Sequence, residues 1–129
     1  MVTVTATGED FSCLVSDGIH QMQADTIAEK GGKNAGFRPH DLLAAALGSC
    51  LAIQLQMYAS RHRIRLGQVS VKVEIDRSVP DRTIFKKEIL IEGDDLSDSD
   101  RKRLHAVSKT CPVQNTLSKQ LEFVMDTTP

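Results

Sequence analysis

The sequence predicts an α+β fold in which antiparallel strands surround one long helix. Strand-like alternation appears near the start of the chain and again after residue 68. Between these regions, residues 42–60 carry no charge and are rich in Ala and Leu, a run too long for a strand. Strands and helices do not alternate in the way that a parallel βαβ sheet requires. The fold is therefore expected to contain antiparallel sheets and a central helix.

Composition favours a single globular domain over residues 1–129, a length that can bury a core. Sixteen basic and seventeen acidic residues give a net charge of −1. This balance offers no basic field for a nucleic acid or an anionic membrane. The opening MVTVTATGEDF is typical of a strand and not of a signal peptide. Three cysteines without C-x-x-C spacing favour a reducing, cytoplasmic location.

The first 25 residues are expected to form three antiparallel strands, with Asp17-Gly18 as one hairpin turn. Phe11, Cys13 and Val15 fall on one face of the second strand, and a structural role is expected for Cys13. Residues 26–37 contain three glycines and indicate a loop. Loops of this length often carry binding functions, although its basic residues are also typical of a solvated surface.

The central helix is expected over residues 38–63. Pro39 suits a first helical turn, Arg61 to Arg63 place positive charge in the last turn, and Gly67 follows as a stop. The uncharged run approaches the length of a membrane span. Polar residues interrupt it, however, so we interpret it as a helix buried in a globular core.

A long hairpin is predicted over residues 68–92, because Val69 to Ile75 alternate cleanly between apolar and polar positions. Helices and a final strand are expected over residues 97–127. Ser97 or Ser99 would cap the first of these helices, and Pro112 would open the second. The last strand is expected over residues 121–126.

Cys50 lies in the middle of the predicted central helix. It shares a stripe with apolar residues, namely Leu43, Ala46, Leu47, Ile53 and Met57. A buried, inert thiol is one interpretation of this position. Cys111 precedes Pro112, which would place its sulfur at a helix N-terminus, where the dipole and free amides lower the pKa of a thiol.

A reactive Cys50 requires a cation from elsewhere, because burial alone would raise its pKa. Arg61 lies eleven residues further on, roughly 16 Å along a helix. Arg38 is comparably remote in the other direction. An activating cation must therefore come from another segment or another subunit.

Two motifs together resemble the OsmC/Ohr family of thiol-dependent hydroperoxide reductases. These are RPHDLLAAALGSCLAIQLQMYA and, about sixty residues later, TCPVQNTL. The order of elements extends the resemblance over nearly the whole chain. The resemblance implies an intertwined homodimer, in which sheets built from both chains wrap the central helices. It matches Cys50 to the peroxidatic cysteine and Cys111 to the resolving cysteine.

The resemblance also implies the chemistry. A Cys50 thiolate would attack an organic hydroperoxide and become a sulfenic acid, Cys111 would close a disulfide, and an external dithiol or thioredoxin-like reductant would restore both thiols. No cofactor, metal, nucleic acid or membrane is expected as a partner. An apolar pocket would favour alkyl hydroperoxides.

The charged residues depart from the family pattern. In the family a carboxylate follows the helix-initiating proline, whereas here His40 does so and Asp41 comes one position later. The family's arginine in the N-terminal strands has no counterpart, since no Arg or Lys precedes Lys30. Lys33, Arg38 and Arg77 are the possible substitutes, of which Arg38 is preferred.

Two other functions remain open at the level of sequence. One is a non-catalytic dimer that binds a small apolar ligand in the cleft around Cys50. The other is a metal site built from Cys50, Cys111 and either His105 or His40, although the chain lacks the short ligand spacing of a zinc motif.

Overall fold

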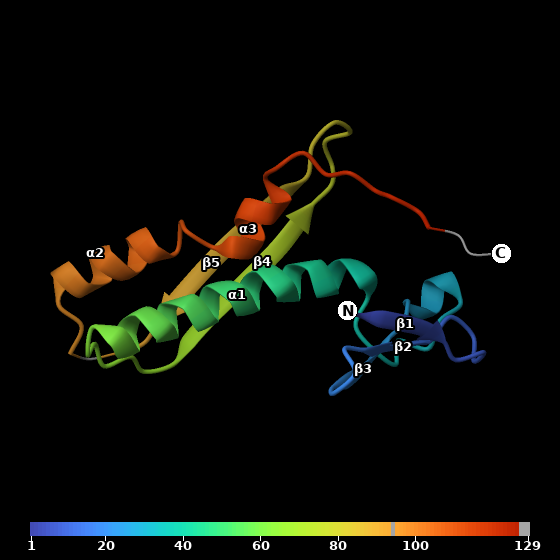
Figure 1. Ribbon diagram of the computed structural model, residues 1–129, viewed down its shortest axis with the longest axis horizontal. Coiled ribbons are helices and arrows are strands. Elements are labelled where there is room, and N and C mark those ends of the chain that lie inside the picture. The colour runs from blue at the N-terminus through green and yellow to red at the C-terminus, as the bar shows by residue number, and fades with distance from the viewer. Residues whose placement is uncertain (94, 127–129) are drawn as a thin grey trace. The chain divides into compact units, whose positions relative to one another are not determined.

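The computed structural model describes residues 1–93 and 95–126. The chain forms two compact units, Met1–Ala45 and Ala46–Pro129. The fold is α+β with antiparallel sheets and a long helix, as the sequence predicts. Each unit is described by itself below, and Figure 1 gives the labels of the elements.

The N-terminal unit holds a three-stranded antiparallel sheet in the order β1-β2-β3. Its strands are β1 (Thr3–Ala6), β2 (Cys13–Ser16) and β3 (Gln21–Ala24). Cys13 pairs with Ala6 on one side and with Ala24 on the other. Cys13 is half-buried, but Phe11 is 61% exposed. The face expected to be buried is therefore only partly covered within this chain.

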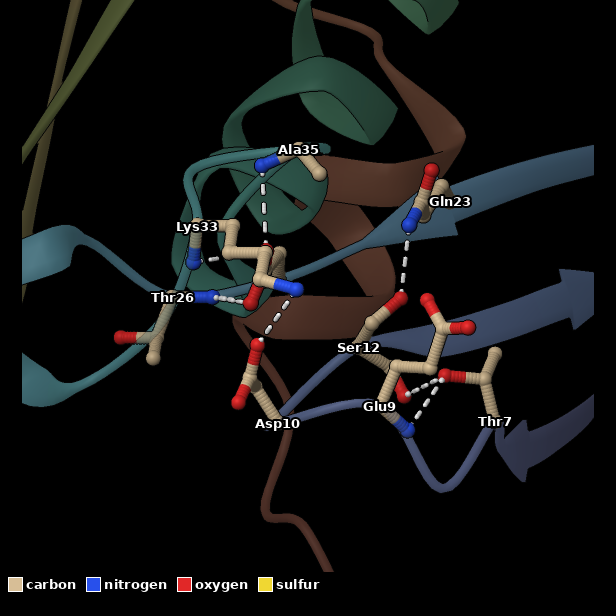
Figure 2. A network of polar contacts seen from close by, with 9 residues as sticks. Thr7, Glu9, Asp10, Ser12, Gln23, Thr26, Lys33 and Ala35 are labelled. Atoms are coloured by element: carbon tan, nitrogen blue, oxygen red, sulfur yellow. Dashed lines mark hydrogen bonds and ion pairs between the residues drawn. The ribbon is translucent and has the colours of Figure 1, made fainter.

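Residues 26–37 form a closed loop that contains one 3-10 turn, η1 (Ala28–Lys30). The buried carboxylate of Asp25 accepts hydrogen bonds from the backbone N–H groups of Thr26, Lys33 and Ala35, at 2.7, 3.2 and 3.0 Å. Lys33 also forms an ion pair with Asp10 at 2.9 Å (Figure 2). The loop is thus held by polar contacts.

The C-terminal unit is built on a two-stranded hairpin, β4 (Val69–Asp76) and β5 (Ile84–Ile91). Helix α1 (Pro39–Arg61) begins in the first unit and ends in the second. Gly48 brings this helix close to the hairpin, since an added Cβ there would lie 3.4 Å from Val73 Cγ2 and 3.7 Å from the Val71 carbonyl oxygen. In Figure 1 the helix runs along the hairpin.

Two short helices complete this unit. Helix α2 (Asp98–Val107) is capped by Ser97, whose side chain accepts a hydrogen bond from the Asp100 N–H at 3.1 Å. Helix α3 is Pro112–Leu117, and its proline stands in the first turn. The core consists of two apolar clusters, one around Leu47, Leu51 and Cys111, the other around Leu55, Ala59 and Leu104.

The stripe expected to be buried on α1 packs against the chain's own core only at Leu47 and Cys50. The buried residues are Leu47, Gly48, Leu51, Leu55 and Ala59. Ile53 and Met57, which share the predicted stripe with Cys50, are 55% and 48% exposed. A helix packs about a third of its circumference against one sheet. The hairpin contacts the stripe next to the predicted one. Cys50 therefore lies at the border between core and exposed surface.

Residues 121–126 form no strand, contrary to the prediction for the C-terminal region 97–127. A strand exists by pairing with a neighbour, and these residues join neither sheet among the described parts of the chain. Phe123, Val124 and Met125 are each more than four-fifths exposed. Residue 127 lies outside the described residues.

Helix α1 is long and apolar enough to span a membrane, by length and composition alone. The core helix of a soluble protein meets the same criteria. Within this chain, 28% of its apolar window is buried. Several apolar side chains of α1, including Leu43, Ile53 and Met57, are thus exposed in the single chain.

Candidate dithiol site

Cys50 and Cys111 come together in the first apolar cluster of the C-terminal unit. Cys111 is completely buried beside Leu47 and Leu51, and Cys50 packs against the same cluster. The two thiols lie near each other. Both are free. They lie 61 positions apart in the sequence, so the fold and not the local sequence creates this pair.

The start of α3 places Cys111. Cys111 occupies the N-cap position with φ −70° and ψ 121°, an extended conformation that residues before proline prefer. Its carbonyl oxygen accepts a hydrogen bond from the Asn115 N–H at 2.9 Å. Val113, one residue beyond Pro112, packs against the cluster. The helix therefore begins with the Cys111 side chain directed into the core.

The surroundings of Cys50 raise its pKa above the ordinary 9.0, and burial is the largest cause. The Cys111 thiol acts in the same direction. The backbone N–H of Val113 acts in the opposite direction and lowers the pKa of Cys50. This amide was not predicted from the sequence, because main-chain donors have no residue signature. The Pro112 that opens α3 is the nearest available signal.

Arg38, His40 and Asp41 lie in the N-terminal unit, at the start of α1. Arg38 binds Asp41 through two hydrogen bonds, from Nε to Oδ2 at 2.8 Å and from its terminal nitrogen to Oδ1 at 3.0 Å. This ion pair lowers the pKa of the Asp41 carboxyl. His40 is exposed. The roles expected for these three residues stay predictions.

Metal binding finds no support in the part of the chain that the structure describes. No group of three or more His, Cys, Asp or Glu side chains is arranged to hold an ion there. His105, a candidate ligand, instead lines a cavity of about 200 Å³ beneath α2. No sequence pattern predicts this cavity. Its lining residues are Leu55, Ile89, Ile91, Arg101, Leu104, His105 and Ser108.

Comparison with known proteins identifies the family. The sequence model of the family described as "OsmC-like protein" matches residues 31–126, which include both cysteines and the whole of α1. The chain therefore belongs to the OsmC-like protein family. A search of curated protein sequences gives no match.

Solved structures share the fold. An OsmC-like protein from Mycoplasma pneumoniae has a TM-score of 0.69 at 24% identity, over 91% of this chain and 85% of that one. An organic hydroperoxide resistance protein OsmC from Legionella pneumophila has a TM-score of 0.60 at 22% identity, over 92% and 88%. The organic hydroperoxide resistance protein OhrB of Bacillus subtilis has a TM-score of 0.62 at 19% identity, over 92% and 89%. At these identities the likeness concerns the fold.

Proposed function

We propose that this protein is a two-cysteine peroxidase that reduces organic hydroperoxides. The observation that carries the proposal is the pairing of Cys50 and Cys111 inside one apolar cluster. Family membership and the hydroperoxide resistance proteins among the structural neighbours add support. Two free thiols that lie near each other can form a disulfide and be reduced again.

The proposed cycle has three steps. The Cys50 thiolate attacks one oxygen of the hydroperoxide, the O–O bond breaks, and the alkoxide takes a proton and leaves as an alcohol. The Cys111 sulfur then attacks the Cys50 sulfenic acid, which releases water and forms a disulfide. An external dithiol donates two electrons and two protons to restore both thiols.

The Cys50 thiolate needs stabilisation beyond the Val113 amide, because burial opposes its formation. We propose that Arg38 of a second copy of the chain supplies this charge, with Asp41 orienting its guanidinium and His40 beside them. The support is that Arg38 has the planar, permanently charged head suited to this task, and that Asp41 holds it in a two-bond geometry.

A homodimer is the second part of the proposal. The exposed side chains of Ile53 and Met57 follow Ala46 and Cys50 along α1 at alternating intervals of four and three residues, the spacing of a helix–helix seam. A second copy of the chain would cover this stripe and enclose Cys50 in an apolar pocket. Such a pocket favours alkyl hydroperoxides over hydrogen peroxide.

Consumption of cumene hydroperoxide with dithiothreitol as the reductant tests this function. Cys50→Ser should abolish turnover, whereas Cys111→Ser should permit one rapid oxidation and leave a sulfenic acid that a dimedone probe labels. Cys13→Ser is the matched control, since Cys13 lies in the other unit. Equal losses of turnover in all three variants would contradict the roles assigned to Cys50 and Cys111.

A second candidate function is non-catalytic binding of a small, mainly apolar ligand. The cavity beneath α2 favours it, because three apolar side chains from α1 and β5 form its floor while Arg101 and His105 stand beside them. A protein that keeps all its thiols after treatment with cumene hydroperoxide would support this alternative.

A further inference from the structure

Lys87 lies on the apolar face of the hairpin. Its cross-strand partner is Val73, and the pairs on either side are Val71 with Ile89 and Ile75 with Phe85. Because paired residues project from the same face of an antiparallel sheet, Lys87 shares the face that packs against the dithiol cluster. Val71, Val73 and Phe85 all contact that cluster.

Lys87 is itself exposed, although the face on which it lies is otherwise apolar. Its neighbour Lys86 points to the other face and forms an ion pair with Asp76 at 3.0 Å. Every other residue on the inner face between Val69 and Ile75, and between Phe85 and Ile91, is apolar. An ammonium group on such a face is costly unless its head reaches a polar partner or water.

The head of Lys87 reaches helix α3. Its Nζ donates a hydrogen bond to Gln114 Oε1 at 2.5 Å, a contact between residues 27 positions apart. Gln114 is half-buried and stands three residues after Cys111. The Gln114 carbonyl oxygen in turn accepts hydrogen bonds from the backbone N–H and the side-chain hydroxyl of Ser118, so it is tied into the helix.

Helix α3 depends on such contacts for its position. It has six residues, none of them fully buried, and Cys111 gives it no side-chain cap. A helix this short is unstable by itself. Cys111 and Val113 attach its start to the apolar cluster, and the bond from Lys87 to Gln114 attaches it to the hairpin. The same short helix carries both groups that face Cys50, the Cys111 thiol and the Val113 amide.

We propose that Lys87 is a positioning residue of the dithiol site, which through Gln114 holds α3 where Cys111 faces Cys50. For its catalytic consequence this inference rests on the proposed peroxidase function. A thiol held in place has a high effective concentration toward its partner sulfur. Without the bond, α3 samples other positions, and closure of the disulfide becomes slower and less favourable.

The direct readout is the equilibrium of the Cys50–Cys111 disulfide with reduced and oxidised glutathione, which needs no hydroperoxide. Lys87→Met keeps the length of the stem but removes the donor, and Gln114→Leu removes the acceptor. Each should shift this equilibrium toward the dithiol by about three- to tenfold, the range for loss of one ordinary hydrogen bond. Lys87→Arg should retain most of the wild-type value.

The double variant and a surface control sharpen the test. If the two residues act through one bond, Lys87→Met/Gln114→Leu should shift the equilibrium no further than either change alone. Lys72→Met is the matched control, because Lys72 lies on the outer face of the same hairpin and pairs with Glu88 at 3.4 Å. It should leave the equilibrium unchanged.

The outcomes separate the inference from the proposed function. An unchanged equilibrium in Lys87→Met, additive shifts in the double variant, or an equal shift in Lys72→Met would each overturn the inference. If the variants show the expected shifts but the wild type consumes no hydroperoxide, the inference stands and the peroxidase is refuted. A wild type that forms no Cys50–Cys111 disulfide with glutathione would refute both.

Discussion

The two units of the chain are stabilised in different ways. In the C-terminal unit, Leu47, Leu51, Leu55 and Leu104 are at most 2% exposed and form an apolar core. In the N-terminal unit, Ala24 is the one buried hydrophobic residue among those that the structure describes. Its larger apolar side chains are open to solvent, including Val4, Phe11, Ile19 and Met22. Polar contacts hold it together, above all those of Asp25 (Figure 2).

This difference shows which parts of the chain lack apolar cover. A unit of about 45 residues without a core does not have enough buried apolar area to offset the entropy of folding. The N-terminal sheet therefore requires apolar cover that its own residues do not provide. The exposed stripe of α1 and the unpaired residues 121–126 have the same requirement. A second copy of the chain, as proposed above, would supply it.

The largest effect is expected from a charge on the exposed stripe. Ile53→Lys should abolish the dimer, because the ammonium group would be buried without a partner at the proposed interface. Sedimentation at micromolar concentration should show the 14.2 kDa chain in the variant and about twice that mass in the wild type. Gln56→Lys, at an exposed polar position of the same helix, is the control and should remain dimeric.

The second effect compares the cores of the two units. Leu51→Ala should lower the free energy of unfolding by about 2–5 kcal/mol, because Leu51 is fully buried and its truncation leaves a cavity. Leu14→Ala should cost less, since 39% of the Leu14 side chain already contacts solvent in the single chain. Chemical denaturation measures both, and equal costs would contradict the contrast between the units.

A smaller, pH-dependent effect should arise at Asp25. Three backbone N–H groups hold the pKa of its carboxyl below the ordinary 3.8. Its contribution to stability is therefore present above pH 3.8 and is lost as the pH falls through the folded-state pKa. Asp25→Asn should destabilise the protein at pH 7 and converge with the wild type at low pH. A constant difference across that range would exclude this role.

The smallest effect is expected from Arg38→Met, on the pKa of Cys50. If Arg38 stabilises the thiolate, the variant should raise the pKa of Cys50 by about one unit, which corresponds to a tenfold loss of thiolate at neutral pH. The rate of alkylation by iodoacetamide, followed against pH, reports this value. An unchanged profile would limit Arg38 to its ion pair with Asp41.

Much of the fold could be predicted from local patterns. Pro39 and the uncharged run that follows it predicted α1. The regular alternation of apolar and polar residues predicted β4. The strand expected over 121–126 failed because strand formation depends on a partner edge that local sequence does not reveal. The buried stripe of α1 could be predicted only in part, for a similar reason. Both sides of the helix are apolar, so periodicity alone could not choose the one that the hairpin covers.

The candidate site was only partly predictable. Cys50 and Cys111 were identified through the resemblance to a family, since nothing in their spacing brings them together. The Val113 amide and the bond from Lys87 to Gln114 depend on how α3 docks onto the hairpin. In the strand IFKKEILI, strict alternation puts Lys87 on the same face as Phe85 and Ile89. The adjacent Lys86 obscures this signal, because two charged residues in a row interrupt the alternating pattern.

The most direct test of the central claim is to map the cysteines after oxidation by one equivalent of cumene hydroperoxide. The reduced protein is treated, its remaining thiols are alkylated, and the digested peptides are analysed by mass spectrometry. The account predicts one disulfide between Cys50 and Cys111 and an alkylated Cys13. A disulfide that involves Cys13, or three alkylated cysteines with the hydroperoxide left intact, would contradict it.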